Sequence, residues 1–118
     1  MKRITTFATL VTAVAILAAN AAAATPKLTA SVSDPLNISL KQGTKKVTSL
    51  KAGKYVIVVK DMAADHNFHL TGPGVNRKTG VAFRGRASWS VTLLPGVYTY
   101  RSDKHKTLRG SLVVTLPF

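Results

Sequence analysis

Hydrophobic and polar positions alternate along much of the chain after residue 25. Residues 27–32, 36–40 and 89–93 each place an apolar side chain at every second position, with polar side chains between them. Successive side chains of a β-strand point to opposite faces, so each run predicts a strand with one face in the core. Few segments in this part of the chain show the spacing of a helix.

Three further runs complete the predicted strands. Residues 55–59 are continuously apolar, which is typical of a strand buried on both faces. Residues 97–100 and 111–116 are also rich in β-forming side chains, and the first of these follows a tight turn at Pro95 and Gly96.

Two polar stretches between these runs are expected to be loops. Residues 41–46 are basic, and residues 72–74 and 76–80 are rich in glycine and other turn-forming residues. Six or seven strands at this spacing predict an all-β fold, a two-sheet sandwich with Greek-key connections. Trp89, and Tyr98 with Tyr100, occupy alternating positions of their strands, so we expect all three in the core.

The first residues have the pattern of an export signal. Lys2 and Arg3 are followed by a mostly apolar stretch over residues 7–19 and by small residues up to Ala24. This predicts a signal peptide over residues 1–24 and a mature domain over residues 25–118, secreted or periplasmic. The apolar stretch is short for a bilayer span, so an uncleaved anchor is the weaker interpretation.

The charge of the chain indicates which partners to expect, and its cysteine content excludes disulfides. The chain has 17 basic and 4 acidic side chains and no cysteine, so it has no disulfides. Such an excess of positive charge favours an acidic protein or an anionic envelope surface as partner. The alternative is that the basic side chains are solvated and bind no partner. Aromatic side chains are not interleaved with the basic ones, which argues against nucleic acid. We expect a monomer that does not span a membrane.

Three histidines are the main candidates for chemistry. His66 and His69 lie close together in sequence, and His105 lies in the loop that leaves the strand at residues 98–100. Loops gather at the ends of a sandwich, and imidazole is the commonest metal ligand among side chains. A solvated or hydrogen-bonded role remains the alternative for each histidine alone.

Two of these segments resemble the cupredoxins, the blue-copper proteins of the plastocyanin and amicyanin type. Residues 98–114 are similar to their C-terminal ligand loop, with a Tyr-x-Tyr strand, a histidine, a glycine and an apolar strand. Residues 65–70 resemble their first ligand loop, where a histidine is followed by asparagine, and residues 51–61 resemble the strand before it. The resemblance spans roughly residues 47–114. It implies a cupredoxin fold, copper binding and electron transfer.

Carried over by position, the resemblance implies that His66 and His105 are metal ligands and that Asn67 braces the ligand loop. Ser102 stands where the family has its cysteine, and Leu108 stands where it has the axial methionine. A blue-copper site needs two imidazoles and a thiolate, and a serine hydroxyl stays protonated near neutral pH. We therefore expect no ordinary blue-copper electron carrier.

A sulfur-free site is the remaining metal hypothesis. Two imidazoles with water and a carboxylate suit copper(II) of type 2 character, and zinc less strongly. Asp65 and Asp103 are candidate additional ligands that could equally cap turns. His69 is a candidate third ligand or an outer-shell residue, because its odd spacing from His66 puts the two on opposite faces of a regular strand. A domain without metal is an equal alternative.

A basic cluster surrounds His105. It consists of Arg101, Lys104, Lys106 and Arg109, and its field should disfavour a dication while suiting an acidic partner. The sequence leaves three candidate functions: a copper-binding protein with impaired electron transfer, a copper chaperone or buffer, and a metal-free interaction module.

Enzymatic activity is not expected. The sequence contains no paired carboxylates, no metalloprotease motif and no phosphate-binding glycine loop. Ser102, Asp103 and His105 lie too close together along one loop to form a catalytic triad readily.

Overall fold

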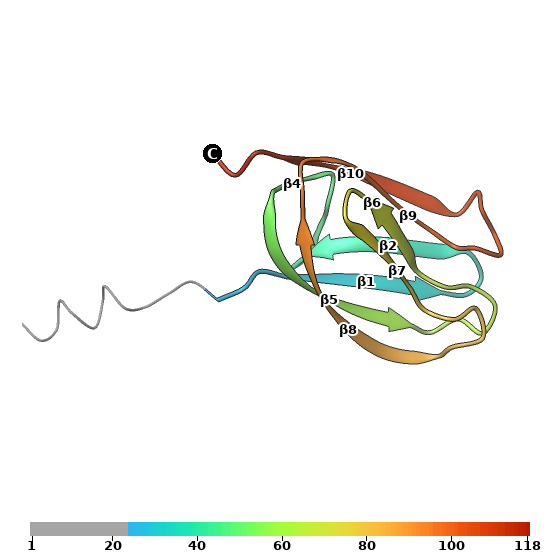
Figure 1. The fold of residues 1–118 in the computed structure, drawn as a ribbon. Coiled ribbons are helices and arrows are strands. Elements are labelled where there is room, and N and C mark those ends of the chain that lie inside the picture. Colours follow the sequence, from blue (N-terminus) through green and yellow to red (C-terminus); the bar gives the residue numbers. More distant parts are fainter. Residues whose placement is uncertain (1–23) are drawn as a thin grey trace, which may run out of the picture.

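The computed structural model describes residues 24–118, which form two five-stranded sheets packed face to face (Figure 1). Sheet A has the strand order β3-β2-β1-β5-β8. Its strands are β1 (Lys27–Ser33), β2 (Asn37–Gln42), β3 (Lys45–Lys46), β5 (Gly53–Asp61) and β8 (Gly85–Leu93). Sheet B has the order β4-β10-β9-β6-β7. Its strands are β4 (Ser49–Lys51), β6 (His69–Gly72), β7 (Val75–Lys78), β9 (Gly96–Arg101) and β10 (Arg109–Thr115).

The prediction of an all-β sandwich is confirmed. Most neighbouring strands are antiparallel, but β1 pairs with β5 and β4 with β10 in parallel, which requires connections that cross between the sheets. All strands of the described residues lie at or after Lys27, so a polypeptide that begins at Thr25 contains every one of them. The predicted signal peptide lies outside the described residues except for Ala24.

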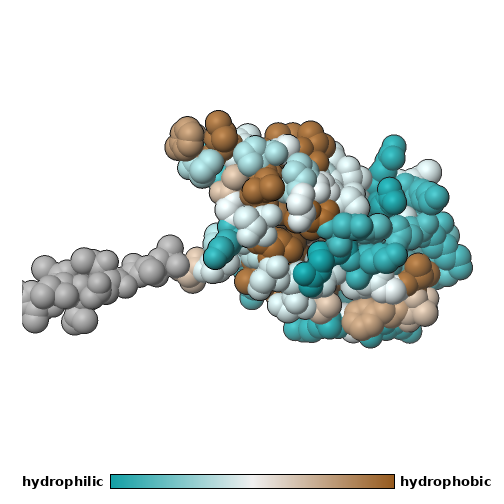
Figure 2. Space-filling model, viewed as in Figure 1, coloured by the Kyte–Doolittle hydropathy of each residue, from teal (hydrophilic) through white to brown (hydrophobic). Residues whose placement is uncertain are grey.

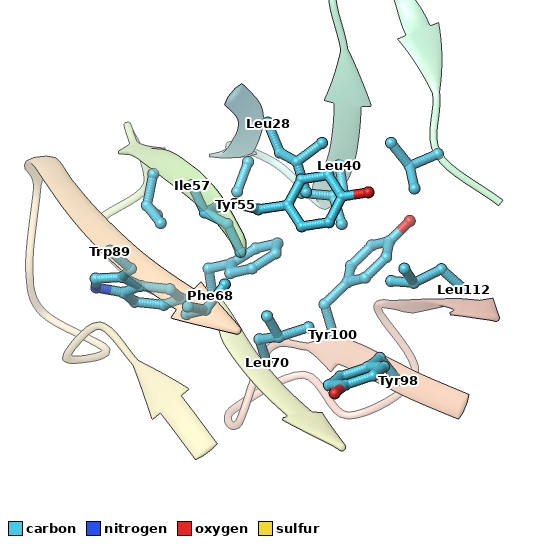
Figure 3. Close-up of a cluster of buried hydrophobic side chains, with 14 of the residues drawn as sticks. Leu28, Leu40, Tyr55, Ile57, Phe68, Leu70, Trp89, Tyr98, Tyr100 and Leu112 are labelled. Atoms are coloured by element: carbon cyan, nitrogen blue, oxygen red, sulfur yellow. The ribbon is translucent and has the colours of Figure 1, made fainter. Parts of the chain in front are cut away.

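The core lies between the two sheets and follows the expected alternation. Leu28, Ala30 and Val32 of β1 are fully buried, and the three aromatic side chains predicted for the core are buried as well. Phe68 stands at the centre, with its ring stacked on Tyr100 at 5.5 Å and lying 6.1 Å from Trp89 (Figure 3). This aromatic contact joins the two sheets directly below the loops that carry the histidines.

One strand is buried differently from the prediction. In β5, Tyr55, Ile57 and Val59 are buried, whereas Val56 and Val58 are only half-buried. The expectation of burial on both faces was therefore wrong. No further layer of the described chain covers the outer face of sheet A, so the apolar run reflects the β propensity of valine rather than two-sided burial.

The two expected loops are hairpins instead. Pro73 and Gly74 form the turn between β6 and β7, with Gly74 at φ 72°, so residues 76–78 are strand rather than irregular loop. Gly43, at φ 64°, allows a two-residue turn between β2 and β3 within the basic stretch. Leu36 lies in the turn before β2 and is 55% exposed, so it is not part of the inner face.

Three connections meet at one end of the sandwich and build the candidate site. They are the β1–β2 turn, the β5–β6 loop and the β9–β10 loop, at the right of Figure 1 and opposite the C-terminus. Within the part of the chain that the structure describes, no helix is long and apolar enough to cross a membrane.

Candidate metal centre

His66 and His105 meet at this end of the sandwich. His66 lies in the β5–β6 loop and His105 in the β9–β10 loop, and their ring centroids are 4.5 Å apart with an interplanar angle of 72°. An imidazole nitrogen binds an ion such as zinc at about 2.0 Å, which places two such rings on one ion roughly 4.5–5.5 Å apart. The pair is therefore spaced as two ligands of one ion would be.

The ring of His66 presents one free nitrogen. Its Nε2 is hydrogen-bonded to the carbonyl oxygen of Pro35, and Asp34 Oδ1 lies 3.8 Å from the same nitrogen. A carbonyl only accepts, so Nε2 is the donor, and in the neutral imidazole Nδ1 then keeps its lone pair. This Nδ1 is buried and has no hydrogen-bond partner. Buried polar atoms without a partner are rare, and an unprotonated imidazole nitrogen is a metal donor.

The neighbouring residues fix His66 in the loop. Ala63 and Phe68, on either side of it, are fully buried in the core. The Ala63 amide also donates to Asp61 Oδ1 at 3.2 Å. His66 itself is only 2% exposed, so its ring cannot swing into solvent without opening this end of the sandwich.

Ser102 and Leu108 close the second loop. Ser102 is fully buried, and its Oγ accepts a hydrogen bond from the His105 amide at 3.2 Å. The Ser102 amide donates to the Leu108 carbonyl, and the Leu108 amide donates to the His105 carbonyl. Neither of these two positions provides sulfur, because Ser102 carries a hydroxyl and Leu108 a hydrocarbon side chain. These side chains do not fit a thiolate-based blue site, whereas the two imidazoles fit a harder copper(II) site.

Asn67 joins the two histidine loops. Its side chain is 1% exposed, and its Nδ2 donates to the Thr79 carbonyl and to Asp103 Oδ2, both at 2.8 Å. Its Oδ1 accepts from the Asp103 amide at 2.7 Å. The two bonds to Asp103 hold the β9–β10 loop beside the β5–β6 loop, and the bond to Thr79 fixes the amide to the segment after β7, which leaves one lone pair of Oδ1 unused.

A buried carboxyl group supports the same arrangement and was missed in the sequence. Thr79 Oγ1 accepts from the Phe68 amide at 3.0 Å and donates to Asp61 Oδ2 at 3.1 Å. Burial raises the pKa of Asp61, while the hydrogen bonds from Ala63 and Thr79 act in the opposite direction. The alternation of β5 could have indicated that Asp61 is buried, because Asp61 occupies the next inward position after Val59.

The structure places His69 away from the histidine pair. His69 Nδ1 lies 2.8 Å from Asp103 Oδ1, and its Nε2 lies 2.6 Å from Asn76 Oδ1, so both ring nitrogens are engaged. Partial burial pushes the pKa of Asp103 upward, but hydrogen bonds from His69 and Asn67 and the charge of Arg101 outweigh it and lower that pKa. Both carboxylate oxygens of Asp103 are therefore already in use.

Asp65 is the carboxylate nearest to His105. Its Oδ2 lies 3.4 Å from His105 Nε2, and its Oδ1 accepts from Lys104 Nζ at 2.6 Å. These hydrogen bonds, that of Lys104 first, lower the pKa of Asp65. Among residues 24–118, no group of three or more histidine, cysteine or acidic side chains is placed to hold a metal ion. The site is a pair of imidazoles.

The predicted basic cluster is partly neutralised. Lys104 pairs with Asp65, and Arg101 Nε lies 3.5 Å from Asp103 Oδ1. Lys106 and Arg109 have no acidic partner in the described chain. Hydrophilic side chains gather at this end of the molecule (Figure 2).

Comparison with solved structures finds rusticyanin, described as a copper protein, at a TM-score of 0.59 and 18% identity over 80% of each chain. A variant of rusticyanin with glutamine in place of a methionine gives 0.58 at the same identity and coverage. Reduced rusticyanin gives 0.56 at 18% identity, over 80% of this chain and 81% of that one.

The chain has the cupredoxin fold. The fold implied by the sequence resemblance is thereby confirmed. No family model matches the sequence, and no curated protein matches it. The likeness to rusticyanin concerns the arrangement of the backbone, because the identity is low.

Proposed function

We propose that this chain is an exported cupredoxin-fold protein that binds copper(II) through His66 and His105 without a sulfur ligand. One observation carries the proposal: a buried His66 Nδ1 without a partner lies on a ring in contact with His105. Copper is favoured because it binds nitrogen donors more tightly than zinc does, and because the fold is shared with a copper protein. The signal peptide that the sequence predicts over residues 1–24 supports a secreted or periplasmic location.

Bound copper would supply a redox-active cation held by the two imidazoles. His66 and His105 would hold it, and Asn67 would keep their loops together. We expect slow electron exchange, because without a thiolate the oxidised and reduced ions prefer different geometries. The protein accordingly acts as a copper-binding protein rather than as an enzyme or an efficient electron carrier.

Titration of the polypeptide from Thr25 with copper(II), followed by paramagnetic resonance and calorimetry, tests the proposal. We expect binding of one copper ion per chain, lost in His66→Ala and in His105→Ala. His69→Ala is the matched control, because that histidine lies outside the pair, and it should bind as the parent does. Retention of binding in His66→Ala, or equal loss in His69→Ala, would contradict the assignment.

A metal-free interaction module is the second candidate. The absence of a third donor beside the pair, among residues 24–118, favours it. In that case Lys106 and Arg109, which lack acidic partners in the described chain, would contact an acidic protein. The same titration separates the two candidates, since this one predicts no binding at micromolar copper.

A further inference from the structure

The acidic side chains of the described chain lie at one end of the sandwich. Asp34 is in the β1–β2 turn, Asp61 ends β5, Asp65 is in the β5–β6 loop, and Asp103 is in the β9–β10 loop. The chain contains no glutamate. The cations on the outer faces of both sheets therefore have far fewer acidic side chains near them than the cations around the histidines have.

The outer face of sheet A carries the largest set of such cations. The buried residues of its strands alternate with outward ones, so the outward residues are known from the burial of their neighbours. The outward cations are Lys27, Lys41, Lys46, Lys54, Lys60 and Arg86. All are exposed except Lys60, which is half-exposed. None has an acidic partner in the part of the chain that the structure describes.

The register spreads these cations over the whole sheet. Lys46 faces Lys41 across β3 and β2, and on β1, β5 and β8 the same row continues with the uncharged Thr29, Val58 and Ser88. In a neighbouring row, Lys60 faces Arg86 across β5 and β8. Five strands about 4.8 Å apart make this face roughly 20 Å wide. The positive charge is therefore planar and distributed rather than concentrated in a pocket.

The remaining outward side chains of this face are mostly hydroxyls. The hydroxyl residues include Thr29, Ser31, Ser39, Ser88, Ser90 and Thr92, and the half-buried Val56 and Val58 of β5 lie among them. Near the end opposite the histidines, a shallow hollow of about 330 Å³ has Lys54, Ser90 and Thr92 in its lining. An ammonium group beside two hydroxyls is a suitable environment for a phosphate group, because all three can donate to its oxygens.

We propose that the outer face of sheet A docks on an anionic phospholipid surface through lipid phosphate groups. A planar array of lysines with hydroxyls between them matches a planar array of phosphates. The face has no aromatic side chain for stacking on bases and no deep apolar pocket for an anchor residue of a protein partner. In this orientation the histidine end points along the surface and stays open to solvent.

Sheet B provides the contrast within the same molecule. Its outer face carries Lys51, Lys78 and Arg109 as well as Arg101, which lies beside Asp103. Three of these cations have no acidic partner in the described chain, against six on sheet A, and an exposed apolar pair, Val97 opposite Val113, lies near the end away from the histidines. Removing three cations from either face changes the net charge equally, so the two faces can be compared directly.

Sedimentation with vesicles, without copper, tests the proposal on the polypeptide from Thr25. Vesicles of phosphatidylglycerol and phosphatidylcholine in equal parts should bind it at low salt, and vesicles of phosphatidylcholine alone should not. Each cation near an anionic bilayer strengthens binding roughly fivefold, so Lys41→Gln, Lys54→Gln and Arg86→Gln together should weaken it by roughly 100-fold. The matched control combines Lys51→Gln, Lys78→Gln and Arg109→Gln and should weaken it far less.

Three results would overturn the proposal. Equal losses in the two triple variants would mean that net charge alone attracts the protein. Equal binding to both vesicle types would remove the role of anionic lipid. Binding to soluble polyphosphate without binding to the vesicles would assign the face to a soluble polyanion. Thermal unfolding checks that both variants fold, and none of these results bears on the copper proposal.

Discussion

Asn67→Ala tests whether the two histidine loops are held together by one buried amide. The substitution removes hydrogen bonds to the Thr79 carbonyl, the Asp103 amide and the Asp103 carboxylate. A buried hydrogen bond between neutral groups contributes about 1 kcal/mol, and one to a charged group about 1.5 kcal/mol or more. The lower value suits the carboxylate, because Asp103 is 28% exposed. We therefore expect the free energy of unfolding to fall by about 3–4 kcal/mol.

Urea unfolding and thermal unfolding measure this loss directly. For a domain of this size, 1 kcal/mol corresponds to about 4–8 °C in Tm, so the midpoint should fall by roughly 15–25 °C. Asn76→Ala is the control, because that asparagine is exposed and its side chain is hydrogen-bonded to His69 Nε2 alone in the described chain, and it should cost less than about 1 kcal/mol. A loss below about 1 kcal/mol for Asn67→Ala would refute the account of the amide as the link between the loops.

Three further results are expected. Nitrogen-15 NMR of the metal-free protein should show His66 with its proton on Nε2; a proton on Nδ1 would contradict the free donor. Ser102→Cys combined with Leu108→Met should give an intense visible band with copper(II), unlike a Ser111→Cys control on the outer face of β10, and a colourless copper complex would count against the geometry. Because burial raises the pKa of Asp61, the folded state takes up its proton at higher pH than the unfolded state. The unfolding free energy of the parent, relative to Asp61→Asn, should therefore rise as the pH falls toward about 3.9, the unfolded pKa; a difference independent of pH would contradict this.

Much of the fold could be predicted because alternation directly reports which side of a strand is buried. β1 and β8 were predicted in this way, and Trp89 is in the core as expected. The prediction of strands failed where polar side chains occupy a strand. Residues 76–78 are polar, yet they form a strand, because their pairing with β6 depends on the turn at Pro73 and Gly74 rather than on an apolar pattern.

The site could be predicted in part. The sequence indicated that His66 and His105 belong to loops at the ends of strands, and the structure brings their rings together. The contacts that fix them involve the Pro35 carbonyl and the Thr79 carbonyl, which are backbone groups and carry no sequence signal. The alternation of β5 places Asp61 on the inward side, but buried acidic residues are so uncommon that this position alone did not predict its burial.

The central claim is that copper(II) is held by two imidazoles and no sulfur. Pulsed paramagnetic resonance of the copper complex, with histidine labelled by nitrogen-15, counts the coordinated imidazole rings directly. The account predicts two rings, one of which disappears in His66→Gln and one in His105→Gln. A spectrum with no coordinated imidazole, or one that loses a ring in His69→Gln instead, would contradict it.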